Sequence, residues 1–501
     1  YLDLIRSADI VFLPYNPPQY RIRGSGVATQ AAAFGTQMVV SHGLDIVDTF
    51  QGFGATQSRS WSTGALADAL IGRIRVVAAQ TPSQRRSARM PVPTSENFAL
   101  SFIQAPETVR VSENRIVLWI SNDTRGEGSE TVYRSQLAYL RDRGYFVIRL
   151  VAPYPARWRL TDLWQFDASA FVADGEIILN FRPGRDIEAI MDDLSGGGDV
   201  LANFSAAWER VQVPPMIKSM LTNQPPAFAV VNYAHHIPIV ESLCEQDIPM
   251  VVETHDIQAL QYAIQQNRAV DPVQLEREMQ LVDRFDQIVS ISHSEAAVFG
   301  KHCSPDKVNW CMPFVDAQPI TLADDWDHDL LFVGSAHHAN VASLKWFLKE
   351  VYEAYLFPMG LSLTIVGTSG DVVDVGRFGD KVKRTGRVQD IAPYYARAGL
   401  VALPIMSGAG VPIKVIDAMT RGVPFVMTDF PARAMDLAQA IPVADSAMAF
   451  AEQVLSCLWS PEERRRRVDL GRDFVNAWAS REHFWKVWDE VVAKLPRREA
   501  Q

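Results

Sequence analysis

Short apolar runs alternate with longer amphipathic segments along most of the chain. The runs after residue 110 predict two series of strands, at 116–120, 146–151, 177–181, 228–232, 249–253, 287–291 and 308–311, then at 330–334, 361–366, 381–384, 400–404 and 423–427. Several of the segments between them carry apolar residues at helical spacing. The clearest apolar helix face is formed by Val341, Leu344, Phe347, Leu348, Val351 and Tyr355. This alternation predicts two mostly parallel sheets with helices on both faces.

Shifts in composition divide the chain into five parts. Residues 1–80 are typical of a partial α/β segment, and residues 81–110, rich in Pro, Ser, Thr and Arg, are typical of a linker. Two α/β domains are expected at 111–320 and 321–465, followed by a helical tail at 466–501. The tail carries aromatic residues at helical spacing, namely Phe474, Trp478, Phe484, Trp485 and Trp488.

The composition narrows the class of protein. A length of 501 residues predicts about two to four domains, and 48% hydrophobic with 21% charged residues is ordinary for a globular chain. The net charge of −10 argues against a nucleic-acid partner. No apolar run approaches the roughly 20 residues that span a bilayer. The four cysteines are scattered without a CxxC pair, which predicts reduced thiols and a cytoplasmic location.

A glycine-rich turn between two strands is the strongest chemical signal. The strand at 400–403 runs into a loop of small residues, Ser407, Gly408, Ala409 and Gly410. A helix carrying Lys414 and Asp417 follows and ends at Gly422. Amide groups at such a helix start bind phosphate, and the lysine adds a cation. The pattern therefore favours a nucleotide-sugar site, although such turns also occur for packing alone.

A weaker copy of this unit lies near the N-terminus. Residues 8–14 parallel 398–404, and residues 25–31 parallel the later loop and helix, with Gln30 in the place of Asp417. Similarity at this separation predicts a duplicated domain. Because the copy lacks its earlier strands and the chain begins with Tyr1, we expect residues 1–80 to be the remnant of an upstream module, inactive by itself.

The second copy resembles the donor-site signature of glycosyltransferase family 4. The matching pieces are Gly408-Ala409-Gly410, Lys414, Asp417-Ala418-Met419 and Gly422-Val423-Pro424. The resemblance covers about residues 110–495 and implies the α/β fold called GT-B, two facing Rossmann-like domains with a C-terminal crossover helix. Residues 111–320 would be the acceptor domain, 321–465 the donor domain and 466–501 the crossover. The tail aromatics would anchor that helix on the first domain.

The resemblance also implies roles for individual residues. Lys414 would neutralise the leaving diphosphate, and Asp417, where the family usually has Glu, would contact donor hydroxyls. His255, in a Thr-His-Asp segment, would face the transferred sugar, while Asp256 is expected to cap the next helix. The other residues expected to bind the donor are Ser335, Asn340, Arg387, Val388, Ser407, Gly408, Ala409 and Gly410. Asn340 has a helix N-cap as its alternative role.

The acceptor side is less well defined. Residues Gly126, Glu127, Gly128, His235 and His236 follow strands of the first domain and are expected near the acceptor, with turn or helix roles as the alternative. We expect no metal site. The acidic run at 324–329 contains Asp-x-Asp twice, the cation motif of GT-A glycosyltransferases, but its place in a linker favours solvated charge. The basic run at 464–467 predicts a solvated helix surface, with an anionic membrane as the alternative partner.

Together these residues imply a retaining glycosyltransferase, of the hexosyl- or deoxyhexosyltransferase class, acting in polysaccharide or glycan assembly. Its partners would be a nucleotide-diphosphate sugar donor and a glycan or lipid-linked glycan acceptor. No cofactor and no obligatory metal are expected, and the location would be the cytoplasm or the inner face of the membrane. Two alternatives stay open, a catalytically degenerate nucleotide-binding scaffold and a GT-B-fold sugar-nucleotide epimerase.

Overall fold

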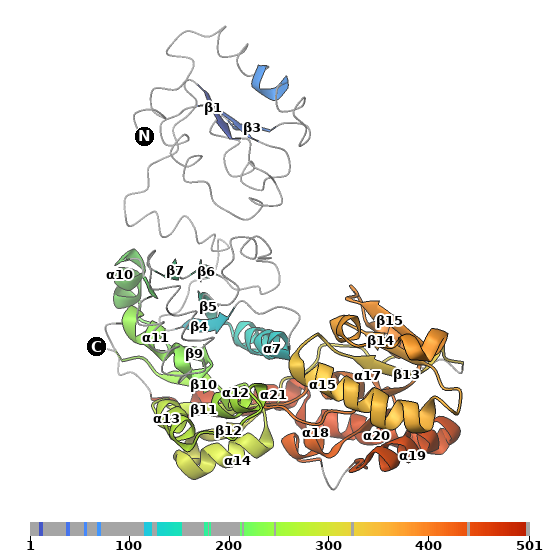
Figure 1. The fold of residues 1–501 in the computed structure, drawn as a ribbon. Helices are drawn as coiled ribbons and strands as arrows, with labels where there is room; N and C mark the ends of the chain where they lie inside the picture. The colour runs from blue at the N-terminus through green and yellow to red at the C-terminus, as the bar shows by residue number, and fades with distance from the viewer. Residues whose placement is uncertain are drawn as a thin grey trace. The chain divides into compact units, whose positions relative to one another are not determined.

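The protein is described here from a computed structural model (Figure 1). The structure describes residues 10–13, 37–40, 55–57, 68–71, 115–122, 128–152, 175–178, 180–181, 211–212, 215–244, 247–321, 325–437 and 441–496. The chain divides into two compact units, Tyr1–Val109 with Tyr154–Val172, and Arg110–Pro153 with Ala173–Gln501.

The first unit contains a small parallel sheet. Its strands lie in the order β1 (Ile10–Leu13), β2 (Gln37–Val40) and β3 (Ala55–Gln57). β1 pairs in parallel with β2. Gln30 and the linker at 81–110 lie outside the described residues. That this unit is the remnant of a duplicated module therefore stays a prediction.

The larger sheet of the second unit has seven parallel strands in the order β12-β11-β10-β9-β4-β5-β6. Its strands are β4 (Ile116–Asn122), β5 (Phe146–Ala152), β6 (Gly175–Ile178), β9 (Phe228–Asn232), β10 (Met250–Glu253), β11 (Gln287–Ser290) and β12 (Val308–Trp310). Its helices are α7 (Gly128–Asp142), α10 (Pro215–Asn223), η5 (Ala234–His236), α11 (Ile237–Leu243), α12 (Gln258–Gln265), α13 (Pro272–Val282), α14 (His293–His302) and η6 (Pro305–Lys307). A short antiparallel pair, β7 (Asn180–Phe181) and β8 (Val211–Gln212), stands apart from the sheet.

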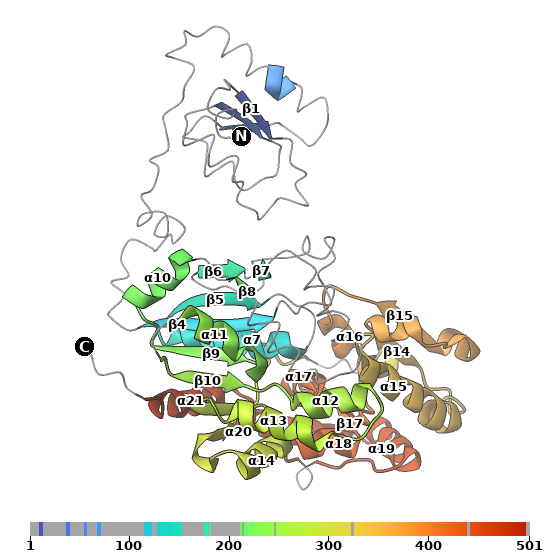
Figure 2. The ribbon, with the colours of Figure 1, turned by 60° about the vertical axis from the view of Figure 1, so that its left-hand side comes forward.

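The smaller sheet has five parallel strands in the order β15-β14-β13-β16-β17. Its strands are β13 (His328–Val333), β14 (Leu363–Val366), β15 (Val382–Gly386), β16 (Ala398–Leu403) and β17 (Phe425–Met427). Its helices are α15 (His338–Trp346), η7 (Phe347–Leu356), η8 (Thr368–Val372), η9 (Gly376–Lys381), α16 (Ala392–Ala396), α17 (Ile413–Arg421), α18 (Asp429–Ala434), α19 (Ala447–Trp459) and α20 (Pro461–Trp478). Figures 1 and 2 show the helices on either side of this sheet.

The apolar runs account for both sheets. Each run expected as a strand forms one, except that 177–181 divides into β6 and β7. The central strands are apolar on both faces because helices cover both, as in β16, where every residue is buried. One expected helix face is wrong in detail, since Tyr355 is exposed. The helix widens into the π-type segment η7, whose larger turn moves the buried face away from that residue.

The last helix, α21 (Arg481–Ala493), leaves the second domain and packs on α7 of the first. Asp489 accepts hydrogen bonds from Arg143 Nε at 2.8 Å and Tyr139 Oη at 3.0 Å, and Trp488 is fully buried beside Tyr139. The preceding helix α20 packs on α17 of the second domain. The expected arrangement of two Rossmann-like domains with a crossover helix is therefore present.

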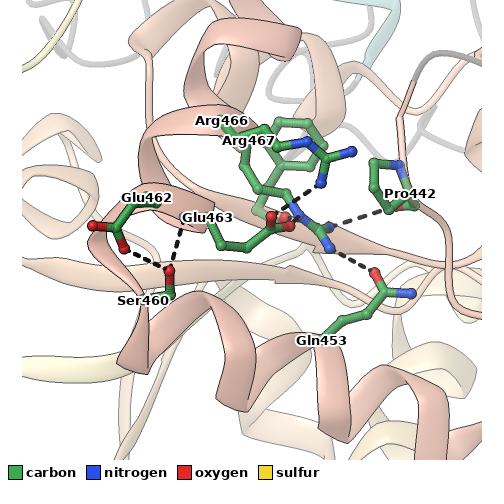
Figure 3. Close-up of polar contacts among 8 residues, drawn as sticks. Pro442, Gln453, Ser460, Glu462, Glu463, Arg466 and Arg467 are labelled. Carbon is green, nitrogen blue, oxygen red and sulfur yellow. Dashed lines mark hydrogen bonds and ion pairs between the residues drawn. The ribbon is translucent and has the colours of Figure 1, made fainter.

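The basic run on α20 is a solvated surface only in part, since Arg465 and Arg466 are exposed while Arg464 and Arg467 are not. Arg467 is almost fully buried, and its guanidinium donates to Glu463 at 2.8 Å and to Gln453 at 2.9 Å (Figure 3). It also donates to the carbonyl of Phe425 at 3.2 Å. Arg464 lies 4.3 Å over the ring of Trp326. The sequence expectation was wrong for these two residues, because helical spacing turns their side chains toward the domain, while Arg465 and Arg466 are exposed as expected. Among the described helices, none has the length and apolar character needed to cross a membrane.

Candidate active site

Each of the two larger sheets reverses its strand order at one position. Several of the candidate donor-binding residues lie at the reversal in the second domain. In the second domain the reversal lies between β13 and β16, whose following loops lead into α15 and α17. Ligands of such sheets bind at the carboxyl ends of the strands at this switch point. Lys414, in the first turn of α17, hydrogen-bonds Asn340 Oδ1 across the switch point. Asn340 in turn donates to the carbonyl and hydroxyl oxygens of Ser335, each at 3.2 Å.

Asn340 is not the N-cap of its helix. The cap of α15 is His337, and the Asn340 side chain is directed to Ser335 and Lys414 instead. The Lys414 amine lies 5.6 Å from the ring centroid of Phe332, and burial lowers its pKa to about 8. The structure thus holds a partly desolvated amine at the start of a helix, where phosphate is favoured.

The glycine loop joins the two domains at Gly410. This residue has φ +67°, and a Cβ atom there would lie 2.4 Å from the carbonyl oxygen of His255. Its N–H donates to Glu295 Oε1 of α14 at 2.8 Å. Only glycine allows this approach, so the loop carrying the phosphate signal rests on the segment carrying the candidate histidine. Gly408 is less constrained, because a Cβ there would lie 3.4 Å from the Phe430 ring.

The other residues of the loop and helix have different surroundings. Ser407 is exposed and Ala409 half-buried, in line with a loop open to a ligand. Asp417 is buried and pairs with Arg421 Nε at 2.8 Å one turn further along α17. The Arg421 guanidinium also lies 5.1 Å over the ring of Tyr395. Asp417 therefore has a structural partner that the sequence did not predict, and its expected contact with donor hydroxyls stays a prediction.

Two strained residues follow neighbouring strands of the first domain. Tyr233 follows β9 with φ +65° and His255 follows β10 with φ +51°, values that residues with a Cβ rarely adopt. Their rings stack at 4.5 Å with an interplanar angle of 15°. Tyr133 closes the His255 ring from the side at 5.2 Å. Strain of this kind costs about 1–3 kcal/mol and clusters at functional sites.

A buried network holds the His255 ring from below. Its Nε2 atom lies 2.8 Å from Asn232 Oδ1, and Gln136 Nε2 lies 3.0 Å from the same oxygen. Trp119 Nε1 donates to Gln136 Oε1 at 2.7 Å. Burial lowers the pKa of His255 to about 3, so the imidazole is neutral at physiological pH. Sequence reasoning missed Asn232 and Gln136, whose only signal was a polar residue at the end of an apolar strand and one within a helix.

The residues expected near the acceptor have different surroundings. Gly128 begins α7, and a Cβ there would lie 3.2 Å from Ile413 Cγ1, so the first turns of α7 and α17 meet. Gly126 and Glu127 lie outside the described residues. His235 and His236 are buried in η5 with rings 4.3 Å apart, and burial lowers both pKa values, that of His236 to about 4.

Glu278 and Glu295 are buried and Asp256 is half-buried beneath the contact between the domains, and the sequence did not predict this. Burial raises the pKa of Asp256 to about 7 and those of Glu278 and Glu295 to about 8. The expected capping by Asp256 is wrong, since Glu278 accepts from the N–H groups of Gln258 at 2.7 Å and Ala259 at 2.8 Å. Asp256 instead accepts from the Gln258 side chain. The segment Ser292–Glu295 had the pattern of a capping box, but the Glu295 carboxyl group holds Gly410.

The remaining predicted features are the turn at Arg387 and Val388 and the acidic run at 324–329. Arg387 is exposed after β15, and Val388 is half-buried against the core of the second domain. In the acidic run, Asp327 pairs with Arg397 at 2.6 Å, and Asp329 accepts from Ser362 and Trp326. No group of three or more His, Cys, Asp or Glu side chains able to hold a metal ion occurs among the described residues.

The comparisons with known proteins agree with this geometry. Residues 327–459 match the model of the protein family described as glycosyl transferases group 1. No protein of curated function matches the sequence. Among solved structures, a sucrose-phosphate synthase from Thermosynechococcus elongatus is similar with a TM-score of 0.53 and 16% identity, over 76% of this chain and 99% of that one.

Two other similar structures were solved with ligands. Anabaena HepE in complex with UDP and glucose has a TM-score of 0.51 and 13% identity, over 75% of this chain and 99% of HepE. TarM from S. aureus, in complex with UDP and other ligands, has a TM-score of 0.53 and 6% identity, over 75% and 99% of the two chains. At these identities the likeness establishes the fold, which is GT-B as expected.

Proposed function

We propose that the protein is a retaining glycosyltransferase that moves a sugar from a nucleoside-diphosphate donor to a hydroxyl group of a glycan or lipid-linked glycan. The observation that carries the proposal is the meeting of Lys414, Asn340 and Ser335 at the switch point of the second sheet, with His255 joined to the same loop through Gly410. A cation and helix-terminal amides on one side, and a neutral imidazole on the other, suit a diphosphate and a sugar respectively.

The leaving diphosphate is assigned to Lys414 and the start of α17. The amine is half-buried, and a charge in such surroundings acts more strongly on a developing phosphate charge than it would in water. Of the loop amides, that of Gly410 already donates to Glu295, so the donor is assigned to the amides beside it. Ser335 and Asn340 hold Lys414 in place and add polar atoms on the facing side.

Retention needs no pair of catalytic carboxylates in this proposal. The acceptor hydroxyl attacks the anomeric carbon from the face that the diphosphate leaves. The bond from that carbon to the diphosphate oxygen breaks, the bond to the acceptor oxygen forms, and a departing phosphate oxygen takes the hydroxyl proton. The protein supplies orientation, charge and exclusion of water.

Donor choice is the first question to test. HepE and TarM were both solved with UDP, which supports UDP-linked sugars as the first donors to screen. We expect a matching donor at about a hundred times its Kd to stabilise the protein by roughly 2.7 kcal/mol. Lys414→Ala should abolish this stabilisation and the transfer activity. Lys345→Ala, which removes an exposed lysine of α15, is the matched control and should preserve both.

The outcomes separate the proposal from its rival. Equal stabilisation of the parent and Lys414→Ala would remove Lys414 from the site. The pairing of Asp417 with Arg421 favours a second candidate, a nucleotide-binding scaffold without transfer activity. Nucleotide binding with neither hydrolysis nor transfer across the donor screen would support that candidate.

We also propose that the reaction needs no bound divalent cation, because Lys414 can supply the charge opposite the diphosphate. Activity should survive dialysis against a chelator. Loss of activity on dialysis, with recovery on adding magnesium or manganese, would contradict this part of the proposal.

A further inference from the structure

The buried hydrogen-bond network beside His255 ends in two groups, one that can only donate and one that can only accept. The indole N–H of Trp119 can only donate, and the backbone carbonyl of Ile120 can only accept. Trp119 Nε1 lies 2.7 Å from Gln136 Oε1, and Asn232 Nδ2 lies 2.9 Å from the Ile120 oxygen. The orientations of both amide side chains follow from these two contacts.

These two orientations fix the direction of the hydrogen bond between Asn232 and His255. Gln136 turns its oxygen to Trp119, so its amide nitrogen faces Asn232 at 3.0 Å. Asn232 turns its nitrogen to Ile120, so its oxygen accepts from Gln136 and lies 2.8 Å from His255 Nε2. An amide oxygen cannot donate. His255 Nε2 must therefore carry the hydrogen.

The other ring nitrogen is left as an acceptor. Burial keeps the imidazole neutral, so the Nδ1 atom of His255 has a free lone pair. This atom makes no hydrogen bond with the described residues. The ring stacks on Tyr233 at 4.5 Å and meets Tyr133 at 5.2 Å, and turning it over would place a C–H group instead of Nε2 opposite Asn232 Oδ1. The backbone oxygen of the same residue touches Gly410, in the donor loop.

We propose that Asn232 is a positioning residue that fixes His255 as the Nε2–H tautomer, so that His255 Nδ1 accepts a hydrogen bond from a hydroxyl of the transferred sugar. The second half of this inference rests on the proposed function, and the first half does not. The strain at Tyr233 and His255 is consistent with it, because both residues keep unfavourable backbone angles to bring the stacked rings over Asn232.

His236 provides an internal reference. Its Nδ1 atom lies 2.5 Å from the backbone oxygen of Asn232, which can only accept, so this neutral histidine must be the Nδ1–H tautomer. The two neighbouring histidines are therefore expected in opposite tautomers, set by the side chain and the backbone of one asparagine.

The test is nitrogen-15 NMR of the full chain labelled at histidine, which distinguishes protonated from unprotonated ring nitrogens. His255→Gln and His236→Gln identify the two signals by their loss. The parent should show His255 as Nε2–H and His236 as Nδ1–H. An Nδ1–H tautomer at His255 would overturn the proposal.

Two variants of the same network separate positioning from general stability. Asn232→Leu removes the partner of His255, so the tautomer should become mixed, and kcat for sugar transfer should fall roughly tenfold for the lost alignment of one hydrogen bond. Trp119→Phe removes the far end of the network but leaves Asn232 fixed by Ile120, so the His255 tautomer should stay that of the parent. An unchanged tautomer in Asn232→Leu would refute the role of Asn232.

A third variant guards against failure to fold. If Asn232→Leu is not folded by circular dichroism, Asn232→Asp keeps an acceptor for His255 and adds a charge. It should retain the Nε2–H tautomer and raise the pKa at which the His255 signal titrates. A His255 pKa equal to that of the parent would contradict the contact. If the parent transfers no sugar from any donor, the proposed function and the sugar contact fail together, while NMR still decides the tautomer.

Discussion

Lys414 is a partly buried lysine whose amine has no carboxylate partner in the part of the chain that the structure describes. Its amine faces Asn340, an uncharged partner, and burial brings its pKa down to about 8. A lysine that has lost hydration without gaining a carboxylate is prepared for an anion from outside the protein. The diphosphate of a donor would supply that anion and restore the amine to full protonation.

Nucleotide affinity should therefore fall as the pH rises through about 8. Below that value the free protein carries the charge, and above it the protein must take up a proton on binding, which weakens the observed affinity. Calorimetric titration with UDP on either side of pH 8 measures this. Lys414→Arg, whose guanidinium stays charged, should bind with little dependence on pH over the same range. A parent affinity that is flat across pH 8 would show that Lys414 does not carry the charge.

At the scale of elements, the glycine loop between β16 and α17 is the piece that joins the domains. Gly410 meets the backbone of His255 in the first domain and donates to Glu295 of α14 in the same domain. The first domain thus holds the loop at Gly410, and the loop leads into the helix that carries Lys414. A change at this glycine should affect both the packing of the domains and the proposed donor site.

Gly410→Ala should be far more harmful than Gly408→Ala. Alanine at φ +67° costs about 1–2 kcal/mol for the backbone alone, and its Cβ would lie 2.4 Å from the His255 carbonyl. The domains must separate to relieve the clash, so we expect a lower Tm and loss of most activity. Gly408→Ala places its Cβ 3.4 Å from a ring that can shift, so Tm and activity should stay close to those of the parent. Thermal unfolding and donor turnover of the two variants provide the comparison, and similar behaviour would contradict it.

The strands and the glycine motif could be predicted from the sequence because each depends on local pattern. Apolar runs such as 400–403 predict buried parallel strands, and a loop of small residues before a lysine predicts a turn that can bind phosphate. The partners of these residues could not be predicted. Asn232 meets His255, and Glu295 meets Gly410, only because neighbouring strands and then whole domains pack together. The burial of Arg467 was missed for the same reason, since its carbonyl partner lies on β17.

At the scale of the whole molecule, the crossover helix α21 ties the two domains into one unit. Trp488 is completely buried between Tyr139 of α7 and Phe484 of its own helix. Trp488→Ala should cost about 3–5 kcal/mol of unfolding free energy, because a large buried side chain leaves a cavity. Trp459→Ala, at a tryptophan that is 62% exposed on α19, should change it by less than about 0.5 kcal/mol. Chemical denaturation measures both, and equal effects would show that α21 does not hold the first domain.

The carboxyl groups at the contact between the domains make stability depend on pH. In the folded protein Glu295 and Glu278 keep their protons to about pH 8 and Asp256 to about pH 7, while the unfolded chain releases them near pH 4. Over that interval the folded state binds more protons than the unfolded state, so the unfolding free energy falls as the pH rises. Each group contributes at most about 1.4 kcal/mol per pH unit.

Glu295→Gln isolates the part of this dependence that lies in the contact itself. Glutamine keeps an oxygen that can accept from the Gly410 N–H, and it cannot ionise. We expect the Tm of the variant to fall less steeply than that of the parent between about pH 5 and pH 8, with the two proteins diverging as the pH rises. Glu452→Gln, at an exposed position of α19, should follow the parent at every pH. Parallel curves for parent and Glu295→Gln would mean that Glu295 is already ionised in the folded protein, and that its hydrogen bond to Gly410 is made by a carboxylate.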